Sequence, residues 1–341
     1  MGKTLIVAGA GASCDWPTVP DHNLVSDQEN SPAAKAQFKL YATLTDLKKH
    51  KSPPLTKDLV RELRQQATGC DQLLQAIYRH QQNNLASFDF EETLRDIVDK
   101  KGKVFKEELL HLRTAIKDRM ALANEIGEKH STLYTQLYGS IKASDRENRD
   151  GSITVNLNYD RLAEFAITNR VGFTNFESYI RNNTGHQLYH PHGHCSWSLG
   201  KTNVQTSLAP ERDNSKHQKV YIGNLTGGHP CLALPMSGDD EGKTAWPAFH
   251  REHLDVELQD VDEILIIGWR GNDKHIVKLI AGSIGHVKNF HIIGNSETGV
   301  EATKQNTKAW NKDDVTVITE KRGFRQYLNS SDSEFKNLFP L

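Results

Sequence analysis

Residues 4–13, TLIVAGAGAS, place a short apolar run directly before a glycine-rich turn. A continuous apolar run that ends in glycine is typical of a parallel β-strand buried on both faces. Glycines after such a strand allow a sharp turn and a close approach to a diphosphate, whose oxygens the exposed backbone amides can bind. The third glycine of the GxGxxG pattern is missing, so a simple tight connection is the alternative. We therefore expect a first buried strand at Thr4 to Ala8, followed by a candidate nucleotide loop.

Further apolar runs repeat this strand pattern along the chain. Helical patterns alternate with the later runs, which is the βαβ rhythm of a parallel sheet. The predicted strands are Ser152 to Leu157, Glu263 to Ile267, Asn289 to Ile293 and Asp314 to Ile318, and the predicted helices are Tyr159 to Thr168, Asp273 to Ala281 and Gly299 to Trp310. The sequence predicts an α/β fold with a doubly wound, Rossmann-like, mainly parallel sheet and a large helical insertion.

The insertion is predicted from the distance between the first two strands. About 140 residues separate them, which is far more than one crossover needs. Leucine and isoleucine recur there at three- and four-residue spacings among charged residues, as in amphipathic helices. We expect one catalytic domain over residues 1–341, with a helical subdomain of four to six helices inserted at 32–143.

Composition limits the classes of partner. The formal net charge of the 341 residues is −1, so no overall field favours nucleic acid or an anionic membrane. No segment approaches the ~18 apolar residues of a membrane span. Four cysteines, Cys14, Cys70, Cys195 and Cys231, form no CxxC pair, which argues against a zinc ribbon and a disulfide scaffold. We expect a cytoplasmic protein with reduced thiols and no direct nucleic-acid binding.

Polar residues follow the second predicted strand in the motif Asn156-Leu157-Asn158-Tyr159-Asp160. Ligands of an open α/β sheet lie at the carboxyl edge of its strands, so the side chains of Asn158 and Asp160 can face one crevice. The alternative is that Asn158 or Asp160 caps a helix that begins near Arg161.

Three alternating histidines stand in the segment Tyr189-His190-Pro191-His192-Gly193-His194. Histidine is the commonest metal ligand, but further ligands for such a site are not apparent, and we expect no metal. A histidine before glycine in a loop suits a general base that reaches into a pocket, which favours His192. His190 and His194 have the alternative of being surface histidines without a role.

Two more glycine turns follow later strands. The first contains Gly268 and Asp273 in IIGWRGND (266–273), and the second contains Asn295 in IIGNS (292–296). Each could be structural, with Asp273 capping a helix. Three glycine turns after three buried strands nevertheless favour a nucleotide site.

In their order, GAGAS, NLNYD, PHGH and IIGWRGND resemble the sirtuin-like NAD-binding domains of bacterial anti-phage defence proteins. Residues 54–59, PLTKDL, look like the family's segment after the glycine loop, and Gly323-Phe324 with Tyr327-Leu328 look like its closing helix. Asn156 departs from the family, which commonly has threonine there. The likeness covers most of the chain outside the insertion.

The resemblance implies roles for individual residues. Asn158 would orient the attacking water and the ribose, Asp160 would be its neighbour in the pocket, and His192 would be the catalytic histidine. The resemblance assigns the diphosphate to Gly9, Ala10, Gly11, Ala12 and Ser13, and the adenosine half of NAD to Gly268, Asp273 and Asn295.

The implied activity is an NAD glycohydrolase that cleaves the bond between nicotinamide and ribose and gives ADP-ribose, with NAD depletion in anti-phage defence as its role. NAD is then the substrate. Alternatives are an NAD-dependent protein deacylase, whose classical members carry a four-cysteine zinc module, and a non-catalytic nucleotide-binding regulatory module. Because unrestrained cleavage would drain the host's NAD, we expect control by a homo-oligomer or by a partner defence protein, such as a DNA-translocating ATPase or a phage sensor.

Overall fold

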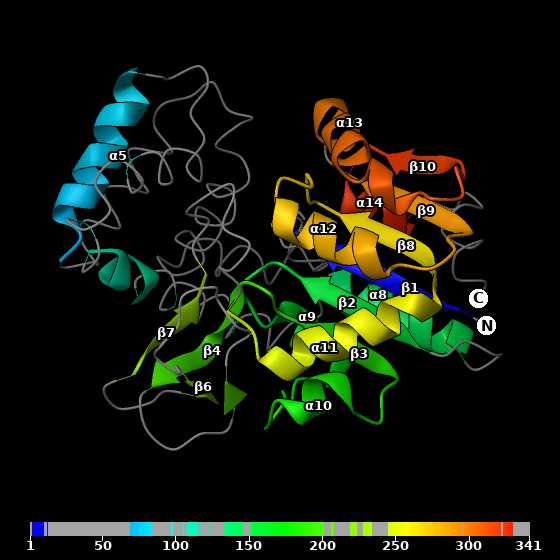
Figure 1. Ribbon diagram of the computed structural model, residues 1–341, viewed down its shortest axis with the longest axis horizontal. Helices are drawn as coiled ribbons and strands as arrows, with labels where there is room; N and C mark the ends of the chain where they lie inside the picture. The colour runs from blue at the N-terminus through cyan, green and yellow to red at the C-terminus, as the bar shows by residue number, and fades with distance from the viewer. Residues whose placement is uncertain are drawn as a thin grey trace, which may run out of the picture.

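The computed structural model shows a parallel sheet with helices on both faces, and a smaller sheet beside it (Figure 1). It describes residues 2–9, 12, 69–83, 97, 105, 108–114, 117, 124, 133–145, 151–200, 206–207, 219–223, 228–233, 245–294, 296–321 and 323–329.

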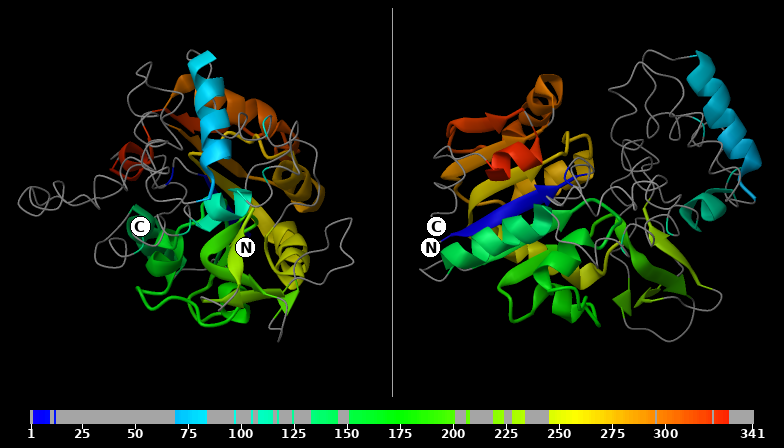
Figure 2. Two further views of the ribbon diagram at one scale, coloured as in Figure 1. Left: turned by 90° about the vertical axis from the view of Figure 1, so that its left-hand side faces the viewer. Right: turned by 180° about the vertical axis from the view of Figure 1, so that it is seen from behind.

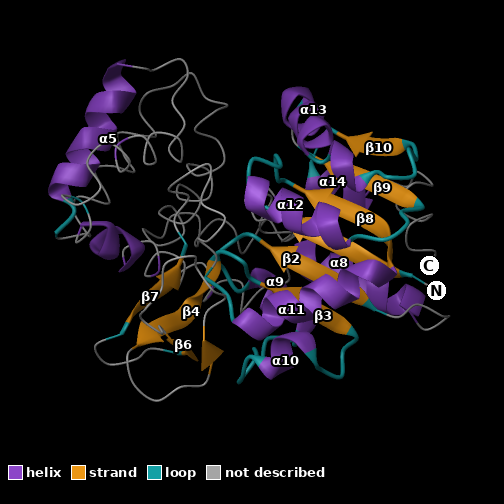
Figure 3. Ribbon diagram, in the orientation of Figure 1, coloured by secondary structure: helices purple, strands orange, loops and turns teal. Residues whose placement is uncertain are grey.

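Six parallel strands form the main sheet in the order β10-β9-β8-β1-β2-β3 (Figure 3). The strands are β1 (Lys3–Ala8), β2 (Ser152–Asn156), β3 (His186–Tyr189), β8 (Val261–Ile267), β9 (Asn289–Ile293) and β10 (Val317–Glu320). Taken in chain order, these six strands follow the 3-2-1-4-5-6 arrangement of dinucleotide-binding sheets. The predicted α/β class and doubly wound parallel sheet are confirmed.

Strand β1 lies at the centre of this sheet, between β2 and β8. Leu5, Ile6, Val7 and Ala8 are all completely buried. A strand that is paired on both edges and covered on both faces has no polar side to present, which explains its continuous apolar sequence. The predicted strand at Asp314 to Ile318 is shifted, since β10 begins at Val317.

Helices cover both faces of the sheet. Helices α11 (Ala248–Glu257) and α12 (Lys274–Ser283) cover the face that is turned to the viewer in Figure 1. Helices α8 (Leu133–Asp145) and α14 (Phe324–Asn329) cover the opposite face, which the right-hand view of Figure 2 shows. Helix α8 contacts α14, and α11 contacts α12. The remaining elements are α9 (Leu162–Ile167), α10 (Glu177–Ile180), η1 (Leu258–Asp260), α13 (Glu297–Asn306) and η2 (Lys308–Trp310).

A second sheet, which the sequence did not predict, lies at the carboxyl end of the main strands (Figure 1). It is antiparallel, in the order β5-β6-β4-β7. Its strands are β4 (Gly193–Gly200), β5 (Thr206–Ser207), β6 (Lys219–Ile222) and β7 (His229–Leu232). Because β4 starts at Gly193, this sheet holds the histidine segment against the edge where ligands of such folds bind.

Much of the predicted insertion at 32–143 lies outside the described residues, as do residues 54–59. Helix α5 (Asp71–Asn83) lies within the insertion and away from the main sheet, as Figure 1 and the right-hand view of Figure 2 show. It buries Leu73, Leu74 and Ile77, as helical spacing requires. Among the described helices, none is long and apolar enough to cross a membrane.

Candidate active site

The candidate site lies where β1 and β8 end side by side. The strand that follows β1 in the chain, β2, lies toward one edge of the sheet, and the strand that follows β8, β9, lies toward the other edge. The point between β1 and β8 is therefore the switch point where open α/β sheets bind ligands. Gly9 N donates to Ile267 O (2.9 Å), Gly268 N to Ile293 O (2.8 Å) and Gly294 N to Glu320 O (2.8 Å). Sheet hydrogen bonding thus continues into the first residue of each glycine turn. All three turns open on one edge, as the sequence predicted.

Gly9 is required by the packing of the two central turns. A Cβ atom at this position would lie 2.6 Å from Trp269 Cβ and 2.8 Å from Gly268 O. Ala12 N donates to Gly9 O (2.9 Å), which closes the turn. This close packing agrees with the alternative of a tight connection, and the diphosphate role of the loop stays a prediction. Ala10, Gly11 and Ser13 lie outside the described residues.

Asn158 ties the second strand's loop to this turn. Its Nδ2 donates to Gly9 O (2.9 Å) and lies 3.4 Å from Tyr134 Oη, while its backbone N donates to Asn156 Oδ1 (3.1 Å). Because Gly9 O can only accept, these contacts fix which end of the amide is nitrogen. The carbonyl Oδ1 of Asn158 therefore points away from Gly9. The structure brings Asn158 and Gly9 together at the carboxyl edge of the sheet.

Asp160 is completely buried, and its Oδ1 accepts a hydrogen bond from Leu162 N (2.9 Å) at the start of α9. The cap position of α9 is Arg161, which makes no side-chain cap hydrogen bond, so Asp160 ties the loop just before the helix and does not cap it. The loop is also joined to the second sheet, because Tyr159 Oη donates to Ala233 O (2.5 Å) and Cys195 N donates to Tyr159 O (2.9 Å).

His192 sits at the corner of a tight turn. Gly193 N donates to His190 O (3.0 Å), so Pro191 and His192 occupy the two central positions. The backbone carbonyls of these two central residues also accept hydrogen bonds. Ala245 N donates to Pro191 O (2.7 Å), and Ala233 N donates to His192 O (2.8 Å). The backbone that carries His192 is therefore held on several sides.

The imidazole of His192 meets the carboxylate of Asp273, with 2.5 Å between Nε2 and Oδ2. The side chains are 22% and 25% exposed, so both line an accessible region. Burial would raise the pKa of Asp273, but the hydrogen bond and charge of His192 lower it to about 2. Asp273 also caps α12, accepting from Ile276 N at 3.2 Å. The capping alternative is thus correct, and the contact with His192 comes in addition.

His190 and His194 are buried completely, so the alternative of surface histidines is wrong. His190 Nδ1 donates to Asn158 O (3.3 Å), and His194 Nδ1 lies 2.7 Å from Ser196 Oγ. Burial, together with the neighbouring His194, holds the pKa of His190 well below its usual range. Burial, together with the charge of Arg161, does the same for His194. Both rings are neutral at pH 7 and hold the turn from inside.

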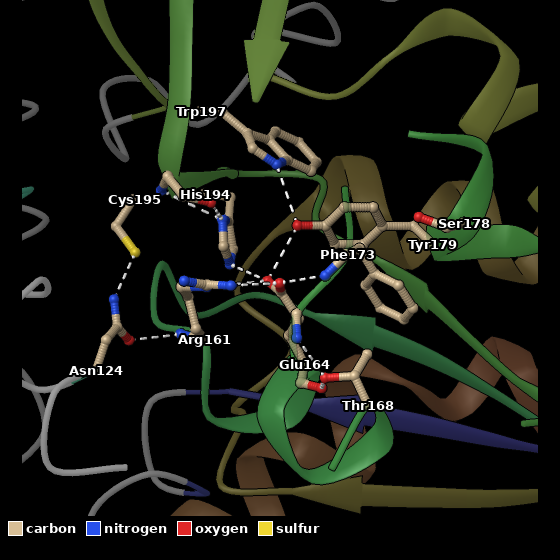
Figure 4. Close-up of polar contacts among 12 residues, drawn as sticks. Asn124, Arg161, Glu164, Thr168, Phe173, Ser178, Tyr179, His194, Cys195 and Trp197 are labelled. Carbon is tan, nitrogen blue, oxygen red and sulfur yellow. Dashed lines mark hydrogen bonds and ion pairs between the residues drawn. The ribbon is translucent and has the colours of Figure 1, made fainter. Parts of the chain in front are cut away.

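A buried carboxylate beneath the turn, Glu164, joins the elements around the site (Figure 4). Its Oε1 accepts from Arg161 Nη2 and Phe173 N, both at 2.8 Å, and its Oε2 accepts from Tyr179 Oη at 3.0 Å. His194 Nε2 lies 3.2 Å from Oε2. This network fixes α9 against β4. Sequence reasoning missed it, because no local pattern marks Glu164 as buried.

The three described cysteines, Cys70, Cys195 and Cys231, are buried thiols outside any disulfide. Burial raises the pKa of Cys195 and of Cys231 to about 12, so neither is a thiolate nucleophile at neutral pH. Within the described ranges, no group of three or more histidine, cysteine or acidic residues is placed to hold a metal ion. Asn295, predicted near the adenosine, lies outside the described residues.

One hydrogen-bonded series thus runs along the carboxyl edge. It links Gly9 to Asn158, Asn158 to His190 in the turn that carries His192, and His192 to Asp273. The amide, the histidine and the carboxylate come from loops after β2, β3 and β8. Comparison of the chain with models of known protein families and with curated proteins gave no match.

Proposed function

We propose that this protein is an NAD glycohydrolase that cleaves the bond between nicotinamide and ribose. The observation that carries the proposal is that the Asn158–Gly9 contact and the His192–Asp273 pair lie along one edge, at the switch point of a sheet with dinucleotide-binding strand order. Binding alone needs neither a base nor a carboxylate that orients it. The chemistry of these residues therefore favours catalysis over a purely regulatory module.

In the proposed reaction, the bond between ribose C1′ and the nicotinamide nitrogen breaks, and its electron pair leaves with nicotinamide. The leaving group is neutral, so no general acid is needed, and the ribose becomes oxocarbenium-like. The oxygen of a water molecule then bonds to C1′. Asn158 Oδ1 accepts a hydrogen bond from this water, and His192 takes its proton and passes it to solvent. The products are nicotinamide, ADP-ribose and a proton.

The other predicted residues take supporting parts in this proposal. The backbone of residues 9–13 would bind the diphosphate, and Gly268 and Asn295 would lie near the adenosine. Asp160 would act from within the protein, by holding the loop that carries Asn158, because its side chain is buried.

The test is chromatography of NAD incubated with purified protein, in which we expect nicotinamide and ADP-ribose. His192→Ala should lower the rate by roughly 100-fold or more, which is the usual contribution of a general base. Asn158→Ala should lower it similarly. His286→Ala is the matched control, since His286 is 95% exposed and lies before β9, at the opposite edge.

Three results would contradict the proposal. Folded His192→Ala and Asn158→Ala variants with full activity would show that the catalytic residues are wrong. NAD binding without release of nicotinamide would indicate a regulatory module. Release that depends on an acylated lysine peptide would indicate a deacylase.

We further propose that cleavage depletes NAD in anti-phage defence and is controlled by homo-oligomerisation or by a partner defence protein. Control is needed because the substrate is essential to the host. Light scattering combined with NAD assays across protein concentration tests this idea, with and without candidate partners. A monomer that is fully active at nanomolar concentration and harmless on expression would refute it.

A further inference from the structure

Asp273 has a defined partner for each carboxylate oxygen. Oδ1 accepts from Ile276 N (3.2 Å) at the first turn of α12, and Oδ2 accepts from His192 Nε2 (2.5 Å). The backbone carbonyl of Asp273 also accepts from Val277 N (3.0 Å). The carboxylate is thus anchored to a ten-residue helix and directed at the imidazole.

The backbone that carries the imidazole is also held in place. Gly193, which follows His192, has a φ of 82°, and a Cβ atom there would lie 1.9 Å from Cys231 O. Only glycine fits this position, so the turn is locked onto the end of β7. The backbones that carry His192 and Asp273 are therefore both fixed where the two side chains meet, and a fixed geometry favours efficient proton transfer.

The contact decides which ring nitrogen can act as the base. An ionised carboxylate only accepts hydrogen bonds, so the proton of neutral His192 is on Nε2 and its lone pair is on Nδ1. When Nδ1 takes a proton, the ring becomes a cation with the Asp273 carboxylate 2.5 Å away. The attraction between the two charges is mutual. Protonated His192 favours the ionised form of Asp273, and the charge of Asp273 favours the protonated form of His192.

We propose that Asp273 is a positioning residue, which holds His192 in the Nε2–H form and stabilises its protonated state. This inference rests on the proposed NAD cleavage, and it replaces the expectation that Asp273 binds the adenosine half of NAD. A carboxylate in this role contributes to turnover rather than to affinity for NAD.

The main test is Asp273→Asn, because asparagine also caps helices well and should keep the bond from Ile276 N. We expect kcat for nicotinamide release to fall by roughly 100-fold or more, with KM for NAD within about 3-fold of wild type. The acid limb of the pH–rate profile should move to lower pH, because the protonated imidazole loses its carboxylate.

A second His–Asp pair provides a matched control. Asp313 accepts from His286 Nδ1 (2.9 Å) and Val287 N (2.7 Å), which repeats the pattern of one imidazole and one backbone N–H. This pair lies at the opposite edge, where β9 and β10 begin. Asp313→Asn should leave kcat, KM and the pH profile unchanged.

Imidazole nitrogen NMR with histidine-selective labelling gives a readout that is independent of activity. The signals of His192, assigned by their loss in His192→Gln, should show the Nε2–H form in wild type and lose it in Asp273→Asn. An Nδ1–H form in wild type would overturn the inference. An Asp273→Asn variant that keeps kcat within about 3-fold, or that changes KM alone, would overturn it as well.

The two proposals fail in different ways. If the wild-type protein releases no nicotinamide, the proposed function fails, and the NMR measurement still decides whether Asp273 orients His192. If the wild type is active, His192→Ala is inactive and Asp273→Asn is normal, the proposed function stands and the role of Asp273 is refuted.

Discussion

Replacing Glu164 by glutamine should destabilise the fold strongly, because the carboxylate is 1% exposed and accepts hydrogen bonds at both oxygens. Glutamine keeps the size but puts an NH₂ group in place of one oxygen. On the Oε1 side it would face Arg161 Nη2 and Phe173 N, and on the Oε2 side Tyr179 Oη. In either orientation at least one buried donor loses its acceptor, and Arg161 loses its counter-charge.

The expected loss follows from these contacts. A buried donor without an acceptor costs about 1–3 kcal/mol, and breaking a buried ion pair costs about 3–5 kcal/mol. Arg161 is 26% exposed, so solvent compensates part of its loss, and we expect the free energy of unfolding to fall by about 3 kcal/mol.

The assay is urea unfolding at pH 7, with Glu177→Gln as the matched control. Glu177 also pairs with an arginine, Arg181, at 2.6 Å, but the two side chains are 60% and 67% exposed. Exposed pairs of this kind contribute about 0.5 kcal/mol or less. A loss of less than about 1 kcal/mol in Glu164→Gln, or one no larger than in Glu177→Gln, would refute this role of the buried carboxylate.

Gly193→Ala should destabilise the protein more than Gly223→Ala. Both glycines have a positive φ, but only at Gly193 would the new Cβ atom clash, with Cys231 O. Equal urea midpoints of the two variants would contradict this. The free energy of unfolding should fall as pH drops from about 6.5 to 4. Burial lowers the pKa of His250 to about 4 in the folded protein, so in this pH range the unfolded chain binds a proton that the folded protein does not. His250→Leu should lose less over that range, as measured by urea titration at each pH. EDTA should leave nicotinamide release intact, and activity that zinc restores after chelation would refute a metal-free site.

Sequence was sufficient for the centre of the main sheet. Strands β1 and β8 contain uninterrupted apolar stretches at 5–8 and 264–267, and β2 and β9 are buried strands with apolar residues in most of their central positions, because strands in the middle of a covered parallel sheet are buried on both faces. Such runs need no knowledge of the partner strands. The glycine turns and the cap of α12 are equally local, since they depend on backbone conformation within a few residues.

Strand β3 and the antiparallel sheet were missed for the opposite reason. The segment from His186 to His194 mixes histidines with apolar residues, and it therefore resembles a surface loop more than a buried strand. Its burial depends on partners from elsewhere, such as the carbonyl of Asn158 for His190 and the carboxylate of Glu164 for His194. Burial of such polar residues is favoured when tertiary structure supplies hydrogen-bond partners or a nearby opposite charge, which local sequence does not show.

The candidate site divides in the same way. Sequence by itself placed Asn158 and the glycine turns on one edge, because parallel strands bring all their carboxyl ends together, whereas it proposed His192 only as a base in a loop. It also offered a helix cap as the alternative role of Asp273, which is a local contact. The pairing of Asp273 with His192 spans 81 residues and joins loops from two strands that are not neighbours. Only the tertiary structure decided this pairing, because the second sheet holds the histidine turn at the carboxyl edge, where His192 reaches the start of α12.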